Sequence, residues 1–165
     1  MYRSNMGNDK MSNQKTNVSL IKSFPIGIVV SYFNYDITSL LKNSTLSYMG
    51  ELGFLQKDII LIEVPGAIEI PLIVKRLAIS NKVKVIITLG SVIKGNTDHY
   101  NYVCQQVSYG CQKVAITFNI PVIFGILTTD NEKQALERIN GKFGCKGREV
   151  VDCALSMFNI LNKYF

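Results

Sequence analysis

The chain has 165 residues, of which 47% are hydrophobic and 18% charged, and this composition predicts one folded domain and excludes a largely disordered chain. The formal net charge is +6, but residues 1–24 hold four basic side chains and one acidic, so the rest is only mildly basic and we expect no nucleic-acid partner. No apolar run approaches the roughly 20 residues of a membrane span, and we expect no secretory signal, no membrane partner and a cytoplasmic location.

Along the chain, apolar runs of strand length alternate with segments that have the hydrophobic periodicity of helices. Residues 1–17 are polar and aperiodic, which predicts a tail that is disordered or ordered only by a neighbour, ahead of one domain over residues 18–165. Four apolar runs of strand length follow, beginning at Ile26, Asp58, Val83 and Pro121. Helices are expected from Ile37 up to Gly53, and over about 69–79, 97–118, 131–140 and 148–162.

The expected helix ends depend on a few residues. Asp36 and Asp130 are predicted to cap the first and fourth helices, and Gly53 is a good residue just past the end of the first. The first helix should bury a stripe of Leu40, Leu41 and Leu46. Strands that alternate with helices require right-handed crossovers, which build a parallel sheet covered on both faces.

We therefore expect an α/β fold, a flavodoxin-like three-layer α/β/α sandwich with a four-stranded parallel sheet. Residues 18–22 could add a fifth strand, either to this sheet or to that of a neighbouring subunit. The four cysteines, at 104, 111, 145 and 153, form no C-x-x-C pair, and one histidine cannot complete a usual zinc site with them. They are predicted to be reduced, half-buried structural thiols, and no metal is expected.

Ligands of open α/β sheets bind at the carboxyl ends of the strands. The segments expected there are residues 31–34, 65–69, 90–99 and 127–130. In the second segment, "PGAIEIP", Pro65 and Gly66 lead directly into a helix whose free amides would face the site. Glu69 could accept hydrogen bonds from ligand hydroxyls, or could merely complement the helix dipole.

The third segment, "GNTDHYNYV", leads into another helix N-terminus, where exposed amides and the Thr97 hydroxyl favour an anion. It is not a Walker loop, because G-x-x-x-x-G-K-[ST] is absent. His99 is expected in the first turn of that helix, whose positive end favours a neutral imidazole able to take up and return a proton. The alternative is a surface histidine on an amphipathic helix.

Two further side chains have both a functional and a structural interpretation. Phe33 follows the first strand and could stack on a flat heterocycle, although a core position is the commoner role of phenylalanine. Arg138 could bind a phosphate with two hydrogen bonds, or could complement the dipole at the end of its helix.

Taken together, these segments resemble the lumazine synthase family, from about Ile26 to the C-terminus. The markers occur in the family's order, as "SYFN" at 31–34, "PGAIEIP" at 65–71, "LGSVIKGNTDHYNYV" at 89–103, "PVIFGILTTDNEKQALER" at 121–138 and "GKFGCKG" at 141–147. The resemblance implies condensation of 5-amino-6-(D-ribitylamino)uracil with 3,4-dihydroxy-2-butanone 4-phosphate to 6,7-dimethyl-8-ribityllumazine, phosphate and water. It implies no cofactor and no metal.

The resemblance also implies a role for each matching residue. Phe33 and Phe124 would contact the pyrimidine, the latter from an adjacent subunit, and His99 would transfer protons. The uracil and its ribityl chain would further be held by Ala67, Ile68, Glu69, Ser91, Val92 and Ile93. The phosphate would be held by Asn96, Thr97, Arg138 and Lys146, with Arg138 also from the adjacent subunit. Asn96 departs from the family, which often has a small or acidic residue there, but it keeps the backbone N–H.

Family members form homo-pentamers, and many assemble twelve of these into a 60-subunit icosahedral shell. The "NGKFG" turn at 140–144 resembles that of shell-forming members, and riboflavin synthase is a candidate partner. Two other functions share this fold: a flavin- or nucleotide-binding module without catalysis, which would not need His99 or Arg138, and a structural shell protein with a vestigial site.

Overall fold

A computed structural model of the chain describes residues 21–140 and 144–165, so the tail predicted over residues 1–17 lies outside the described residues. The four strands are β1 (Ile26–Ser31), β2 (Ile59–Val64), β3 (Val85–Ile93) and β4 (Val122–Thr129). The helices are α1 (Tyr35–Leu52), α2 (Ile70–Ser80), α3 (His99–Phe118), α4 (Glu132–Asn140) and α5 (Lys146–Tyr164). Short 3-10 turns, η1 (Gln56–Asp58) and η2 (Ala67–Glu69), flank β2.

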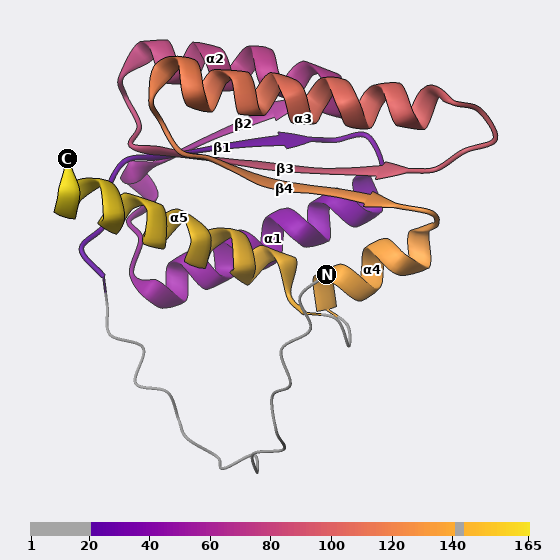
Figure 1. Cartoon of the computed structure of the whole chain (residues 1–165). Coiled ribbons are helices and arrows are strands. Elements are labelled where there is room, and N and C mark those ends of the chain that lie inside the picture. The colour runs from indigo at the N-terminus through magenta and orange to yellow at the C-terminus, as the bar shows by residue number, and fades with distance from the viewer. Residues whose placement is uncertain (1–20, 141–143) are drawn as a thin grey trace, which may run out of the picture.

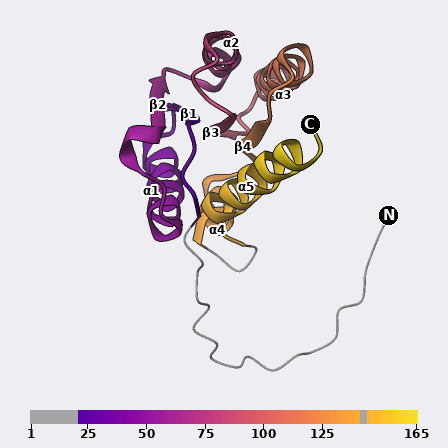
Figure 2. The same ribbon diagram turned by 90° about the vertical axis from the view of Figure 1, so that its left-hand side faces the viewer.

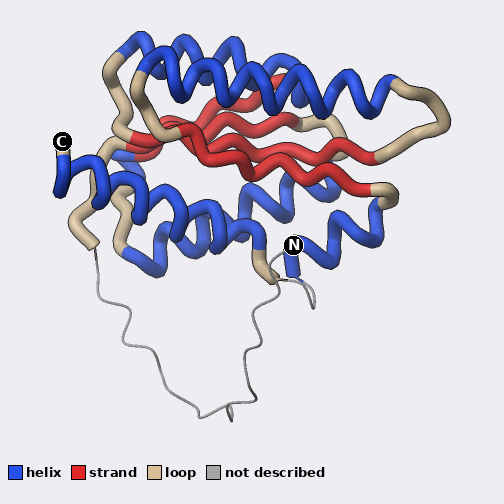
Figure 3. The backbone as a smooth tube through the Cα atoms, viewed as in Figure 1, coloured by secondary structure: helices blue, strands red, loops and turns tan. Residues whose placement is uncertain are grey.

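The four strands form one parallel sheet in the order β2-β1-β3-β4, which confirms the predicted sheet. Helices α2 and α3 cover one face, and α1, α4 and α5 cover the other (Figure 1). Figure 2 shows the same layers after a quarter turn, and Figure 3 shows the strands enclosed between the helices. The predicted three-layer α/β/α sandwich is therefore confirmed.

A fifth strand over residues 18–22 falls mostly outside the described residues. Of its two described positions, Ile21 and Lys22, neither belongs to a strand. The Ile21 amide donates instead to the Leu52 carbonyl at the end of α1, at 3.0 Å. Among residues 21–140 and 144–165, no helix is long and apolar enough to cross a membrane.

The strands end at different heights. The last pair between β1 and β3 is Val30 with Leu89, whereas β3 and β4 stay paired up to Ile93 with Thr129. Residues 90–93 of β3 therefore extend beyond the last pair with β1. We call this segment the β3 overhang, and it forms one wall of the site described below.

Both predicted aspartate caps are wrong. Helix α1 begins at Tyr35 behind Asn34, so Asp36 lies inside its first turn, where its charge still suits the helix dipole. Helix α4 begins at Glu132, and the Asn131 side chain accepts from the Gln134 amide at 2.9 Å. Asn131 takes the capping position in place of Asp130 because it lies three residues before Gln134. The Asn131 side chain then accepts from the Gln134 N–H, and the Gln134 side chain accepts from the Asp130 N–H.

The buried face of α1 is rotated relative to the predicted leucine stripe. Leu41 is completely buried, but Leu40 is 41% exposed, and Leu46 packs at the margin of the core. Ile37 and Met49, four residues before Leu41 and eight after it, complete the face that contacts the sheet. Gly53 ends the helix at φ 93°, as predicted, and its amide donates to the Gly50 carbonyl.

Leu41→Ala is expected to lower the free energy of unfolding by about 2–5 kcal/mol, because it leaves a cavity beside the sheet. Leu40→Ala is the matched control, with the same chemical change at an exposed neighbour and an expected cost below about 1 kcal/mol. Denaturant unfolding of both variants gives the comparison. Equal losses would mean that the helix presents a different face to the core.

All four cysteines are free, as predicted. Cys104 and Cys111 both lie on the side of α3 that packs toward the core, and burial raises the pKa of the Cys111 thiol to about 11. Cys111 therefore stays protonated at neutral pH and packs as a small apolar side chain. Cys104 and Cys145 are partly buried, but Cys111 is buried and Cys153 is exposed, so the expectation of half-burial fails at these two.

Candidate active site

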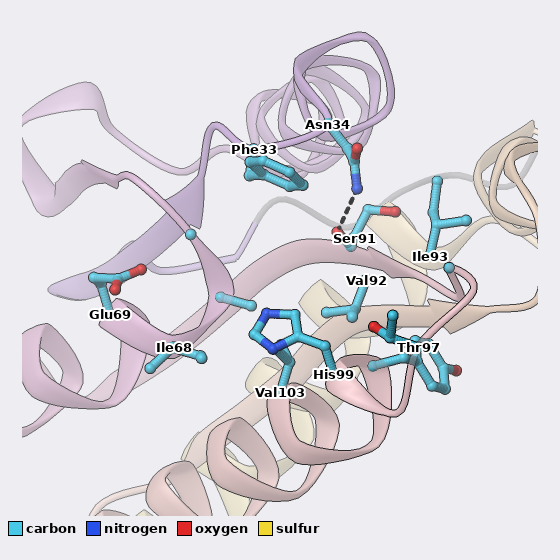
Figure 4. A pocket seen from close by; sticks show the side chains of 14 residues that line it. Phe33, Asn34, Ile68, Glu69, Ser91, Val92, Ile93, Thr97, His99 and Val103 are labelled. Carbon is cyan, nitrogen blue, oxygen red and sulfur yellow. Dashed lines mark hydrogen bonds between the residues drawn. The ribbon is translucent and has the colours of Figure 1, made fainter.

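A cavity of about 360 Å³ lies at the carboxyl ends of β1, β2 and β3, where the fold predicted a ligand site (Figure 4). It is formed by the loop after β1, the η2 turn, the β3 overhang and the first turns of α3. Nine of the predicted site residues line it: Phe33, Ala67, Ile68, Glu69, Ser91, Val92, Ile93, Thr97 and His99. The fourth predicted segment, residues 127–130 at the end of β4, does not line this cavity.

Phe33 is presented to the cavity and is not a core residue. Its side chain is 68% exposed, which excludes the core interpretation for the described chain. Its amide donates to the Pro65 carbonyl at 3.0 Å, and the Tyr32 amide donates to Val64 at 2.9 Å. These bonds tie the loop after β1 to the end of β2, so an aromatic face stands at the mouth of the cavity (Figure 4).

The segment after β2 differs from the predicted direct entry into a helix. The η2 turn comes first, and α2 begins only at Ile70. A side chain at Gly66 would meet the Glu69 carboxylate, since a Cβ there would lie 2.9 Å from Oε2. The glycine therefore leaves space for an exposed carboxylate at the cavity wall, where it can accept hydrogen bonds from hydroxyl groups.

The β3 overhang supplies one wall of the cavity. Ser91, Val92 and Ile93 were expected after the strand, but they are its last three residues. Ser91 is 3% exposed, and among the described residues its Oγ and that of Ser31 are the buried side-chain oxygens without a hydrogen-bond partner. A hydroxyl without a partner is costly to bury, and because the Ser91 Oγ is itself buried, it is not exposed to the cavity.

His99 is the first residue of α3, so the helix begins two residues later than predicted. Thr97 lies in the preceding turn, and both residues line the cavity. The His99 ring is exposed and directed into the cavity (Figure 4), which places it within reach of a bound ligand. The structure thus joins the histidine, the helix N-terminus and the aromatic Phe33 at one site. Within the described ranges, no three His, Cys, Asp or Glu side chains form a cluster that could hold a metal ion.

Three of the predicted residues lie elsewhere. Phe124, Arg138 and Lys146 do not line the cavity but share a second hollow beside β4, α4 and the start of α5. Glu149 Oε2 lies 3.3 Å from Arg138 Nη2 and 3.5 Å from Lys146 Nζ, so one carboxylate bridges the two cations. Asn96 is exposed and lines neither space. We call the second space the cationic hollow.

Five cavity residues were not named as site residues: Asn34, Gly66 and Gly95, which lie in the segments expected at the ligand edge, and Tyr100 and Val103, which lie beyond them. Val103 could have been found, because it follows His99 by four residues and so shares its face of the helix. Tyr100 lies beside His99, and burial, followed by the neighbouring Cys104, raises the pKa of its phenol. Its hydroxyl therefore stays protonated at neutral pH and can donate a hydrogen bond.

Comparisons with known proteins match most of the chain. A family model described as 6,7-dimethyl-8-ribityllumazine synthase matches residues 23–162. Relatives with the same name from two Coxiella burnetii strains, CbuG_Q212 and RSA 493 / Nine Mile phase I, are each 49% identical over 141 residues. In both cases the match covers 86% of this chain and 93% of the relative.

Proposed function

Because the chain belongs to the 6,7-dimethyl-8-ribityllumazine synthase family, we propose that the cavity at the ends of β1, β2 and β3 is the active site in which it makes that lumazine. The chain is a transferase of riboflavin biosynthesis. It condenses 5-amino-6-(D-ribitylamino)uracil with 3,4-dihydroxy-2-butanone 4-phosphate, and releases phosphate and water. The observation that carries the assignment of the site is that nine expected residues from separate segments line one cavity.

Each part of the cavity suits one part of the substrates. The exposed Phe33 ring can stack on the pyrimidine, and the carboxylate of Glu69, with the backbone of Ala67 and Ile68, can hold the ribityl hydroxyls. The end of β3, at Ser91, Val92 and Ile93, contacts the polar edge of the ring. This division leaves the turn before α3 for the phosphate.

The phosphate binds at that turn through Thr97 and the Asn96 backbone, at the positive end of α3. Imine formation, loss of phosphate and ring closure each move protons, and His99 at the same helix end takes up and returns them. No protein nucleophile is needed. Holding two reactants in register supplies much of the rate enhancement.

The site is shared between two subunits in this proposal. Phe124, Arg138 and Lys146 line the cationic hollow, away from the cavity, and a neighbouring copy brings them to it. A homo-pentamer provides such neighbours, and it is supported by exposed apolar side chains on α2 and α3, among them Leu72 and Ile116 at 64% and 73% exposure.

A 60-subunit icosahedral shell and a complex with riboflavin synthase are the further assemblies we propose. Residues 141–143 of the "NGKFG" turn lie outside the described residues. Light scattering of the purified protein separates pentamer from shell. The four free cysteines support a cytoplasmic location.

Mixing the purified protein with both substrates should produce the absorbance and fluorescence of the lumazine. Omitting either substrate is the control, since neither alone contains all the product's carbon atoms. A chain that binds an isoalloxazine without turnover would instead be a flavin-binding module. A chain that assembles but neither binds nor converts these compounds would be a structural shell protein.

A further inference from the structure

Asn34 departs from two local rules at the start of α1. The residue that caps a helix N-terminus normally has an extended backbone, and an asparagine there normally accepts a hydrogen bond from an amide of the first turn. Asn34 has instead φ 57° and ψ 50°, in the left-handed region, and its side chain makes no capping bond. Its backbone carbonyl alone accepts from the amides of Ile37 and Thr38, both at 3.0 Å.

The side-chain amide of Asn34 forms a hydrogen bond with a different strand, β3. Asn34 Nδ2 donates to the Ser91 carbonyl at 3.0 Å, a contact between residues 57 apart in the chain (Figure 4). Because the acceptor is a carbonyl, only the NH₂ end of the amide can face it. Ser91 lies on the β3 overhang, beyond the last pair with β1, so Asn34 supplies a donor where that ladder has ended.

The left-handed backbone is unusual at this position. Asn81 and Asn119 are also left-handed, but both end helices, where this conformation is common. At a helix start, a residue with a Cβ adopts it only where surrounding contacts compensate its steric cost, and such residues cluster at functional sites. The contact with Ser91 is a compensating interaction that points to the cavity.

We propose that Asn34 is a positioning residue that sets the separation between Phe33 and the end of β3, and so the width of the slot that takes the flat pyrimidine. The backbone N–H of Phe33 anchors its loop to the end of β2, and the side-chain amide of Asn34 anchors the same loop to β3. Without the second anchor, the ring face and the polar edge of the slot can separate. This inference rests on the proposed function of the cavity.

Asn34→Gly is the informative variant, because glycine adopts the left-handed backbone freely and removes only the amide. We expect the KM for 5-amino-6-(D-ribitylamino)uracil to rise about tenfold, while the KM for the butanone phosphate stays within about twofold. Asn34→Asp keeps the shape but turns a donor into an acceptor facing the Ser91 carbonyl, so its KM for the uracil should rise further. Asn119→Gly, the same change at the left-handed residue after α3, should leave both constants unchanged.

Fluorescence titration with 6,7-dimethyl-8-ribityllumazine gives a second measurement, independent of turnover, and product binding should weaken in the same order of variants. Equal KM increases for both substrates, or unchanged lumazine binding in Asn34→Gly, would overturn the proposal. If the unmodified chain formed no lumazine, the proposed function would fail, and the titration would still decide the role of Asn34. Melting temperatures identify any variant that fails to fold, in which case the other Asn34 variant is used.

Discussion

Arg138→Ala is expected to raise the KM for 3,4-dihydroxy-2-butanone 4-phosphate by about 100-fold and to change the KM for the uracil by less than about threefold. A charged arginine–phosphate contact contributes about 1.5–3 kcal/mol, equivalent to about a 12- to 160-fold change in KM, and two hydrogen bonds favour the upper part of that range. The variant also leaves the Glu149 carboxylate with Lys146 alone, which makes the cationic hollow less attractive to an anion. Initial rates with each substrate varied in turn give the two constants.

Arg148→Ala is the matched control for this prediction. Arg148 lies in the first turn of α5, whereas Arg138 lies in the last turn of α4; it pairs with Glu51 at 3.3 Å and lies over the Tyr48 ring, outside the cationic hollow. Its loss should leave both KM values within about twofold. If Arg138→Ala raised the two KM values equally, the arginine would be supporting the structure and not the phosphate.

His99→Ala is expected to lower kcat by about 100-fold with little change in either KM. General acid–base catalysis contributes about 10²–10⁴-fold, and the lower end is expected because positioning of the two reactants survives in the variant. His99→Gln keeps a side chain that forms hydrogen bonds but cannot carry a proton between steps, so it should be about as slow. A glutamine variant with the parent rate would show that His99 only orients the substrate.

The two variants together test whether the site spans two subunits. In co-assembled protein, some interfaces join the intact cavity of an Arg138→Ala subunit to the intact cationic hollow of a His99→Ala subunit. Such mixtures should exceed the activity of either variant alone. No recovery in assemblies shown to contain both chains would place all of the site within one subunit.

The sequence predicted the four strands and the ligand edge well, because continuous apolar runs between helices leave few other arrangements. It predicted helix starts less well, since an asparagine takes the cap position at both sites: Asn34, two residues before Asp36, and Asn131, directly after Asp130. Asn34 lies in the predicted segment 31–34, but its role was missed, because its backbone conformation and its partner Ser91 depend on how far β3 extends past β1. Strand register of this kind is set by packing across the sheet and leaves little trace in local sequence.

The β3 overhang has a consequence for how this site tolerates change. Peptide groups of residues 91–93 are common to nearly every amino acid, so substitutions of similar size there would leave the proposed backbone contacts to the ring edge in place. Proline is the exception, because it lacks the N–H. Sequences of this kind can therefore drift along the strand while catalysis persists, and selection against change should concentrate on side chains such as His99 that cannot be replaced by a backbone group.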